Sequence, residues 1–240
     1  QSSSWNAPVR DAVTNSLKKW TQLGVDGFRI DAAKHFVEGE KSNDDAAEPR
    51  NLELLSYFSS EVKKLNSDAT LLAEAWDNYS TIDKYIGKAT DAALDFPFME
   101  SLRESVKTEK SQSIFFALKH IEQTQSIFPA GRRVVFAGNH DVSRLTTEFA
   151  DVGKAKLAHL VTLLNAHSPL LLYAEELGIE GKVKRPNPED PTDTEEYVHT
   201  VFAFPWNGQN QSVGFPGGKA PVVGLPANYQ TANLQTAEAD

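Results

Sequence analysis

Five short apolar segments alternate along the chain with segments of helical periodicity, and this alternation constrains the fold more than any other sequence feature. Such alternation is typical of βα units that build a parallel sheet covered by helices. We therefore predict an α/β fold. The predicted strands are residues 24–35, 70–76, 92–96, 133–138 and 169–173, and the predicted helices are residues 9–20, 52–65, 80–88, 114–121 and 152–166.

Prolines and glycines mark where this alternation stops. Pro97 is expected to end the third strand, because proline cannot donate a ladder hydrogen bond. From Gly178 onward both residue types are frequent and no amphipathic helix is evident. The pattern predicts a long irregular segment over residues 179–240.

The composition excludes several classes of function. With 40% hydrophobic and 24% charged residues and no long apolar run, the chain fits a soluble protein without a membrane partner. The formal net charge of −9 argues against nucleic acid as a partner, because phosphate binding favours a basic surface. The absence of cysteine excludes disulfides and a thiol nucleophile. Localisation stays open, and we expect a secreted or periplasmic bacterial protein in preference to a cytoplasmic one.

Acidic side chains stand near the C-terminal ends of three predicted strands. Asp31 and Glu74 belong to the first and second strands, and Asp141 follows the fourth. In β/α barrels the reactive groups come from this end of several strands. The two-residue period of a strand also places Arg29 on the face of Asp31, in what we expect to be a confined interior.

Each of these residues also has a structural explanation. Asp31 and Asp141 could be N-caps of the helices that follow them. Glu74 could be a solvated residue at a strand end, and the arginine before Asp31 could form an ion pair with it alone. The two nearby histidines, His35 and His140, could be core residues. It is the coincidence of three acids at three strand ends that favours a functional site.

Two kinds of chemistry fit several carboxylates around one pocket. In glycoside hydrolysis one carboxylate attacks the sugar while a protonated one donates its proton to the leaving oxygen. Neighbouring negative charge and partial burial help to keep the second group protonated. The same acids with a histidine could instead bind a divalent metal, as in metal-dependent hydrolases.

Three stretches resemble signature regions of the α-amylase family of glycoside hydrolases (glycoside hydrolase family 13). Residues 27–35, 73–76 and 136–141 are similar to the second, third and fourth regions, and they occur in the family's order. Residues 170–178 resemble the family's eighth barrel strand and the turn after it, with Ala174 where glycine is commoner.

The resemblance implies a partial TIM (β/α)8 barrel that covers about the fourth to eighth strands. Residues 1–178 would be the C-terminal part of the catalytic barrel and residues 179–240 the irregular segment after its last strand. The eighth helix and a C-terminal β domain would be absent. A partial barrel exposes strand edges and apolar surface, so we expect the isolated segment to be inactive or poorly folded.

The resemblance also implies roles for the acids. Asp31 would be the nucleophile, Glu74 the general acid/base, and Asp141 the carboxylate that binds sugar hydroxyls and stabilises the transition state. Arg29 would keep the nucleophile ionised. The mechanism implied is retaining double displacement, with the carboxyl groups of Asp31 and Glu74 about 5–5.5 Å apart.

The remaining implied residues bind substrate. Asn139 and His140 would contact the sugar, the latter in the cleaved subsite, and Lys34 with His35 would line the leaving-group side. No metal ligand or cofactor is implied for the chemistry. Several family members bind a structural calcium at the carbonyl matching His35, so calcium could be present in the full-length protein.

The implied substrate is an α-1,4-glucan or a maltooligosaccharide, because Ala32 stands where relatives specific for α-1,6 links tend to carry valine. Transglycosylases and sugar isomerases of the same family share the three acids. A non-catalytic amylase-like partner protein is a further alternative, although such proteins lose the acids. We expect a monomer.

Overall fold

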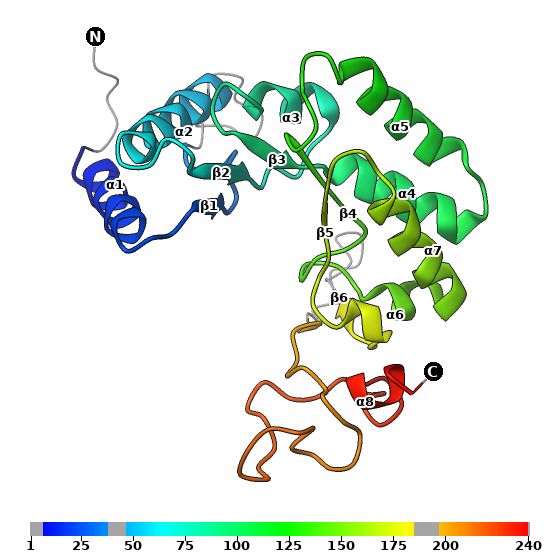
Figure 1. The fold of residues 1–240 in the computed structure, drawn as a ribbon. Helices are drawn as coiled ribbons and strands as arrows, with labels where there is room; N and C mark the ends of the chain where they lie inside the picture. Colours follow the sequence, from blue (N-terminus) through cyan, green and yellow to red (C-terminus); the bar gives the residue numbers. More distant parts are fainter. Residues whose placement is uncertain (1–6, 38–46, 185–196, 240) are drawn as a thin grey trace, which may run out of the picture. The chain divides into compact units, whose positions relative to one another are not determined.

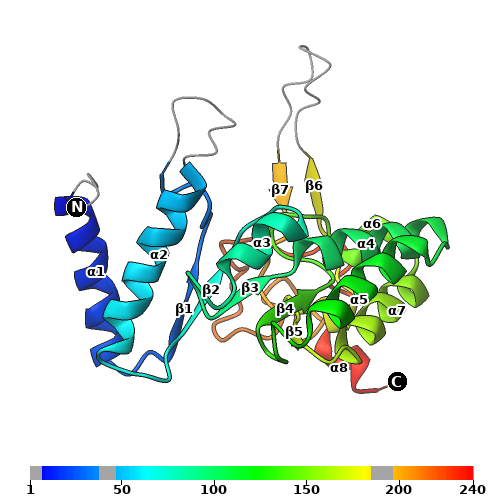
Figure 2. The same cartoon turned by 90° about the horizontal axis from the view of Figure 1, so that it is seen from above.

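The computed structural model describes residues 7–37, 47–184 and 197–239, and Figures 1 and 2 show it from two directions. The chain forms two compact units. The first comprises Gln1–Pro97, His120–Val135 and Ala166–Ser168, and the second comprises Phe98–Lys119, Phe136–Asn165 and Pro169–Asp240. The predicted boundary at residue 178 stays a prediction.

A five-stranded sheet with the order β1-β2-β3-β4-β5 confirms the five predicted strands. The pairs β1–β2, β2–β3 and β3–β4 are parallel, as the βα alternation predicts. In the first pair Gly27 lies opposite Thr70 and Ile30 opposite Ala73. The strands are β1 (Gly27–Ile30), β2 (Thr70–Ala73), β3 (Ala92–Leu94), β4 (Arg133–Phe136) and β5 (Ser168–Leu170).

Two long helices lie side by side in the first unit (Figures 1 and 2). They are α1 (Ala7–Gln22) and α2 (Ala47–Lys63), and an ion pair between Lys18 and Glu61 joins them. The apolar side chains of α2 recur at helical spacing, so one face of this helix is buried. The buried residues on that face include Leu54, Leu55, Phe58 and Val62.

Helix α3 (Tyr79–Tyr85) begins where the side chain of Asn78 accepts a hydrogen bond from the Thr81 amide, an N-cap. The sequence pattern does not predict the helix α4 (Phe96–Thr108). The expectation that Pro97 only ends a strand is wrong, because Pro97 is the second residue of that helix. Proline in the first turn of a helix lacks an N–H that would have no partner within the helix anyway, so it is tolerated there. Helix α5 (Gln112–Thr124) follows as predicted.

The second unit contains several shorter elements. These are α6 (Leu145–Phe149), α7 (Val152–Leu163), the 3-10 helix η1 (Glu175–Leu177), β6 (Lys182–Lys184), β7 (Tyr197–His199) and α8 (Leu234–Ala237). The side chain of Asp151 caps α7 by accepting a hydrogen bond from the amide of Lys154 at 3.1 Å. The strands β6 and β7 pair as an antiparallel ribbon (Figure 2).

This ribbon and the one-turn helix α8 lie in the segment that was expected to be irregular, which otherwise consists mainly of turns and bends. None of the helices in the described ranges combines the length and the apolar character that crossing a membrane requires.

The close approach of β1 to β2 at Gly27 gives a test of this sheet. A Cβ atom at Gly27 would lie 2.4 Å from the carbonyl oxygen of Thr70. We expect Gly27→Ala to lower the free energy of unfolding by about 1–3 kcal/mol, because backbone atoms of paired strands cannot move aside cheaply. Denaturant unfolding measures the change.

A matched control is Gly153→Ala in α7, where the nearest atom to an added Cβ is the carboxylate tip of Asp151 at 3.0 Å. This variant should be neutral or slightly stabilising, since alanine favours helix over glycine. Equal effects of the two substitutions would contradict the strand contact.

Candidate active site

Asp31 and Glu74 follow β1 and β2 directly, at the C-terminal ends of neighbouring parallel strands. Backbone hydrogen bonds extend the pairing past the strands. The amide of Glu74 donates to the carbonyl of Ile30 at 3.0 Å, and the amide of Ala33 donates to the carbonyl of Glu74 at 2.8 Å. The register of one strand pair therefore fixes the backbone positions of both acids.

The guanidinium of Arg29 contacts both acids. Its Nη1 lies 2.7 Å from Oδ1 of Asp31, and its Nη2 is paired with Oε1 of Glu74. Burial lowers the pKa of Arg29, but the hydrogen bond to Asp31 and the charge of Glu74 outweigh it and raise the pKa above its usual value. Arg29 therefore stays charged beside both acids and compensates the negative charge of each when it is ionised.

The two acids differ in exposure. The side chain of Glu74 is 12% exposed, and its Oε2 accepts a hydrogen bond from the amide of Ala32 at 3.1 Å. The side chain of Asp31 is 75% exposed and that of Arg29 is 36% exposed. Glu74 is therefore not a solvated residue at a strand end. The confined setting expected for Asp31 and Arg29 is not seen in this chain, because β1 stands first in the strand order and, among the described strands, pairs with β2 alone.

Two further structural explanations fail in the first unit. A turn at residues 31–34 follows Asp31 instead of a helix, so Asp31 is not an N-cap. His35 is exposed and is not a core histidine. Its backbone amide donates to the carbonyl of Ala32 at 2.8 Å and closes that turn.

Ala32 has a left-handed backbone with φ +46°. This conformation costs an L-residue about 1–2 kcal/mol, and a β-branched residue more. It is the conformation in which the amide of Ala32 reaches Glu74, so the local strain serves to orient the second acid.

The candidate residues of the second unit lie in the loop after β4. Asp141 comes five residues after the strand, and its amide donates to Oδ1 of Asn139 at 2.9 Å. The Nε2 atom of His140 lies 3.4 Å from Oδ2 of Asp141. Helix α6 has Arg144 at its N-cap, so Asp141 is not a cap, and the His140 side chain is about half exposed, so it is not a core histidine.

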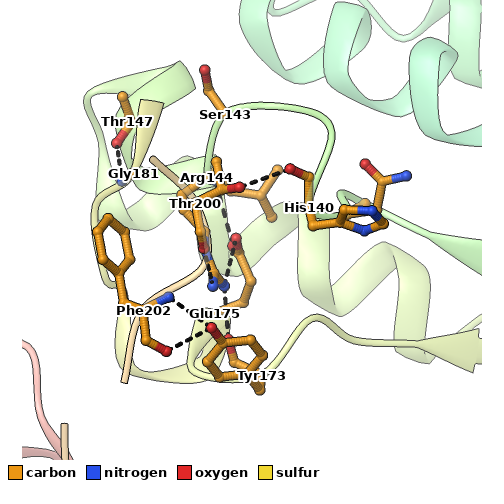
Figure 3. A network of polar contacts seen from close by, with 12 residues as sticks. His140, Ser143, Arg144, Thr147, Tyr173, Glu175, Gly181, Thr200 and Phe202 are labelled. Atoms are coloured by element: carbon orange, nitrogen blue, oxygen red, sulfur yellow. Dashed lines mark hydrogen bonds and ion pairs between the residues drawn. The ribbon is translucent and has the colours of Figure 1, made fainter. Parts of the chain in front are cut away.

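The side chain of Arg144 holds the end of this loop in place through the contacts that Figure 3 shows. Arg144 is fully buried, and its guanidinium donates to the carbonyls of Tyr173 at 2.7 Å and Thr200 at 2.6 Å. It also pairs with Glu175 at 3.4 Å. The hydroxyl of Thr200 donates to the carbonyl of His140 at 2.7 Å, so the segment after β7 supports the loop directly.

The structure thus groups the predicted residues by unit. Arg29, Asp31, Glu74, Lys34 and His35 belong to the first unit, and Asn139, His140 and Asp141 belong to the second. The roles of these residues, and the convergence of the three acids on one pocket, stay predictions.

Sequence reasoning missed three residues that support the candidate site. Asp77 pairs with Lys34, while Arg144 and Thr200 hold the loop that carries Asp141. A carboxylate three residues after Glu74 could have drawn attention to Asp77. The contact between Arg144 and Thr200 spans 56 residues, and no local pattern signals it.

Metal binding was a second chemistry allowed by the sequence. Over residues 7–37, 47–184 and 197–239, no group of three or more His, Cys, Asp or Glu side chains is arranged to hold a metal ion. A structural calcium at the carbonyl of His35 stays a prediction.

Comparison with known proteins gives one family. The family model described as "Alpha amylase, catalytic domain" matches residues 4–240 of the sequence. Alpha-amylase 3 of Dictyoglomus thermophilum is 32% identical over 228 residues, which cover 93% of this chain and 41% of that protein. The 4-alpha-glucanotransferase of Thermotoga maritima is 28% identical over 232 residues, which cover 94% of this chain and 46% of that protein.

The fold agrees with these matches. The crystal structure of an alpha-amylase from H. orenii aligns with a TM-score of 0.74 and 24% identity, covering 98% of this chain and 44% of that one. The predicted partial TIM barrel is confirmed. The chain spans less than half the length of each of these proteins.

The strained backbone of Ala32 gives a test within the first unit. We expect Ala32→Val to lower the free energy of unfolding by about 1–3 kcal/mol, because a β-branched residue tolerates the left-handed conformation poorly. Thermal or denaturant unfolding measures the change.

Ala12→Val in α1 is the matched control, since Ala12 is exposed on a regular helix. In an exposed helix valine costs about 0.7 kcal/mol or less relative to alanine. If the two variants were equally stable, Ala32 would not be strained in solution.

Proposed function

The chain belongs to the alpha-amylase family, and from this premise we propose that it forms the catalytic part of a retaining α-glycoside hydrolase acting on α-1,4-glucans or maltooligosaccharides. The proposal covers the substrate, the stereochemistry and the residues that act. It rests on the geometry of the first unit and on the family to which the chain belongs.

One observation carries the proposal. A single guanidinium, that of Arg29, contacts carboxylate oxygens of both Asp31 and Glu74. Two carboxyl groups that contact the same guanidinium lie close together. Such an arrangement suits the carboxyl–carboxyl separation of about 5–5.5 Å in retaining enzymes better than the 6.5–9.5 Å of inverting ones. The shorter separation of retaining enzymes leaves no room for a water molecule between the nucleophile and the sugar.

In the first step a carboxylate oxygen of Asp31 attacks the anomeric carbon. The bond from that carbon to the leaving oxygen breaks, and Glu74 transfers its proton to the leaving oxygen. In the second step Glu74 removes a proton from water, the water oxygen attacks the anomeric carbon, and Asp31 is released. Arg29 stabilises the negative charge of Asp31 before its attack and again when it is released.

The loop after β4 would supply the third carboxylate. Asn139 accepts the amide hydrogen bond of Asp141 and so fixes the turn that presents this acid. We assign Asp141 and His140 to sugar hydroxyls of the cleaved residue. Hydrogen bonds to these hydroxyls that strengthen as the ring flattens stabilise the transition state.

Transfer to a sugar acceptor is the second candidate activity. It is favoured by the similarity to the 4-alpha-glucanotransferase of Thermotoga maritima, which aligns over nearly the whole chain. Hydrolysis and transfer share the covalent intermediate and differ only in the acceptor that Glu74 activates.

We expect Asp31→Asn and Glu74→Gln, each made in the natural full-length protein, to lower kcat on maltotriose by a factor of about 100 to 10,000 or more. With an aryl α-maltoside, whose leaving group needs no protonation, Glu74→Gln should retain much more of the rate of the first step than Asp31→Asn. Quenched-flow kinetics and mass spectrometry of the peptide containing Asp31 measure the step and the intermediate.

Asp26→Asn and Glu53→Gln are matched controls, since both side chains are exposed and lie away from the strand ends that carry the candidate acids. They should leave kcat unchanged. Release of the β-anomer as first product, observed by proton NMR, would show inversion and contradict the proposal.

The acceptor is tested separately. Incubation of the full-length protein with maltotriose should release glucose without longer oligosaccharides if water is the acceptor. Accumulation of maltotetraose and longer products would assign transfer instead. Loss of activity with a chelator that calcium does not restore would favour a metal-dependent hydrolase.

A further inference from the structure

Beyond the paired acids, a second polar contact joins the loops after β1 and β2. The ammonium of Lys34 donates to the carbonyl of Trp76 at 2.7 Å and to Oδ2 of Asp77 at 2.9 Å. Lys34 follows Asp31 by three residues, and Trp76 and Asp77 follow Glu74 by two and three. These three residues, named here the loop clamp, therefore lie directly beside the two acids.

Both ends of the clamp are fixed. The side chain of Asn51, which is buried on α2, donates to the carbonyl of Lys34 at 2.7 Å and accepts the amide of Val37 at 2.7 Å. On the other side, Oδ1 of Asp77 accepts the amide of Asn78 at 2.7 Å. The loop after β1 is thus held to α2, and the clamp then ties it to the loop after β2.

The charged ends of the clamp are largely removed from solvent. The side chains of Lys34 and Asp77 are 28% and 27% exposed. Burial alone would raise the pKa of Asp77, but the hydrogen bonds from Lys34 and from the amide of Asn78 lower it below its usual value. Asp77 therefore remains ionised at neutral pH, and the ammonium of Lys34 donates to two protein acceptors.

Trp76 adds an aromatic contact to the clamp. Its ring stacks on that of Phe96, with centroids 4.7 Å apart and planes 18° from parallel. Phe96 is fully buried at the start of α4. The carbonyl oxygen of Trp76 that accepts the hydrogen bond from Lys34 thus belongs to a residue whose ring is already held by stacking.

We propose that Lys34 is a positioning residue, which sets the separation of Asp31 and Glu74 by holding the loop after β1 to Trp76 and Asp77. This inference rests on the proposed function of the two acids. It differs from a role in which the ammonium binds the leaving-group sugar, because a positioning residue acts through the two loops and need not touch substrate.

The test compares Lys34→Met, Asp77→Asn and the double variant in the full-length protein, with an aryl α-maltoside too short to reach distant subsites. A misplacement of reacting groups by about 1 Å costs about 100-fold in rate. We expect each single variant to lower kcat by about that factor with KM little changed. The double variant should be no worse than the slower single variant, because both remove the same contact.

Direct sugar binding gives a different result. In that case Lys34→Met would raise KM on long oligosaccharides, and Asp77→Asn would behave as wild type. Either of these observations overturns the inference. Should Lys34→Met fail to fold, Asp77→Asn, which keeps the shape of the side chain, carries the test alone.

Lys154→Met is the matched control, since it breaks an ion pair with Glu109 (2.7 Å) that lies elsewhere in the chain. It should leave kcat unchanged. Amide hydrogen exchange at Ala33 and His35 gives a readout independent of activity, and both clamp variants should accelerate it. Unchanged exchange would overturn the inference even if the wild-type protein proved inactive and the proposed function failed.

Discussion

The contact of one arginine with two carboxylates is the interaction on which the candidate site depends. Two acids at adjacent strand ends repel each other, and Glu74 is almost buried. A buried charge is costly unless it is paired and hydrogen-bonded. Arg29 satisfies both acids at once because the parallel register sets Ile30 opposite Ala73, so that the residues which follow these two emerge side by side. The register of β1 on β2 thus also sets the relative positions of the two candidate acids.

Each unit also contains a fully buried arginine that joins segments distant in the sequence. In the first unit, Arg133 lies 2.6 Å from Asp83 and about 5 Å from the ring centroids of Tyr79 and Phe128. In the second unit, Arg144 lies 5.0 Å from the centroid of Tyr173 and binds two carbonyl oxygens. Removing one partner of such a buried pair typically costs about 3–5 kcal/mol. Arg133 thus ties β4 to α3, and Arg144 ties the loop after β4 to the backbone at Tyr173 and Thr200.

The strands and most helices could be predicted because their apolar residues recur at the period of the element they form. Asp31 and Glu74 could be placed because each directly follows such a strand. Prediction failed where the signal was not periodic. The short strand β6 has the sequence Lys-Val-Lys and too few residues to show alternation. The support of the loop that carries Asp141 depends on Arg144 and on residues 29 and 56 positions further along the chain. Contacts of that range follow from the tertiary fold, and the local sequence does not encode them.

Two alanines in left-handed conformation show how strain and function are related in this chain. Ala32, with φ +46°, follows the candidate nucleophile, and Ala174, with φ +62°, follows Tyr173, which comes three residues after the end of β5 at Leu170. Glycine would adopt either conformation without steric cost. The strain persists because hydrogen bonds determine each turn. The amide of Ala32 binds Glu74, and the carbonyl of Ala174 accepts the amide of Leu177 at 3.2 Å. At Ala32 the strained amide points at the candidate acid/base, so relaxing the turn would remove one of the two groups that orient Glu74. We therefore regard the strain at Ala32 as part of the machinery that prepares the site, and the strain at Ala174 as a cost of its tight turn.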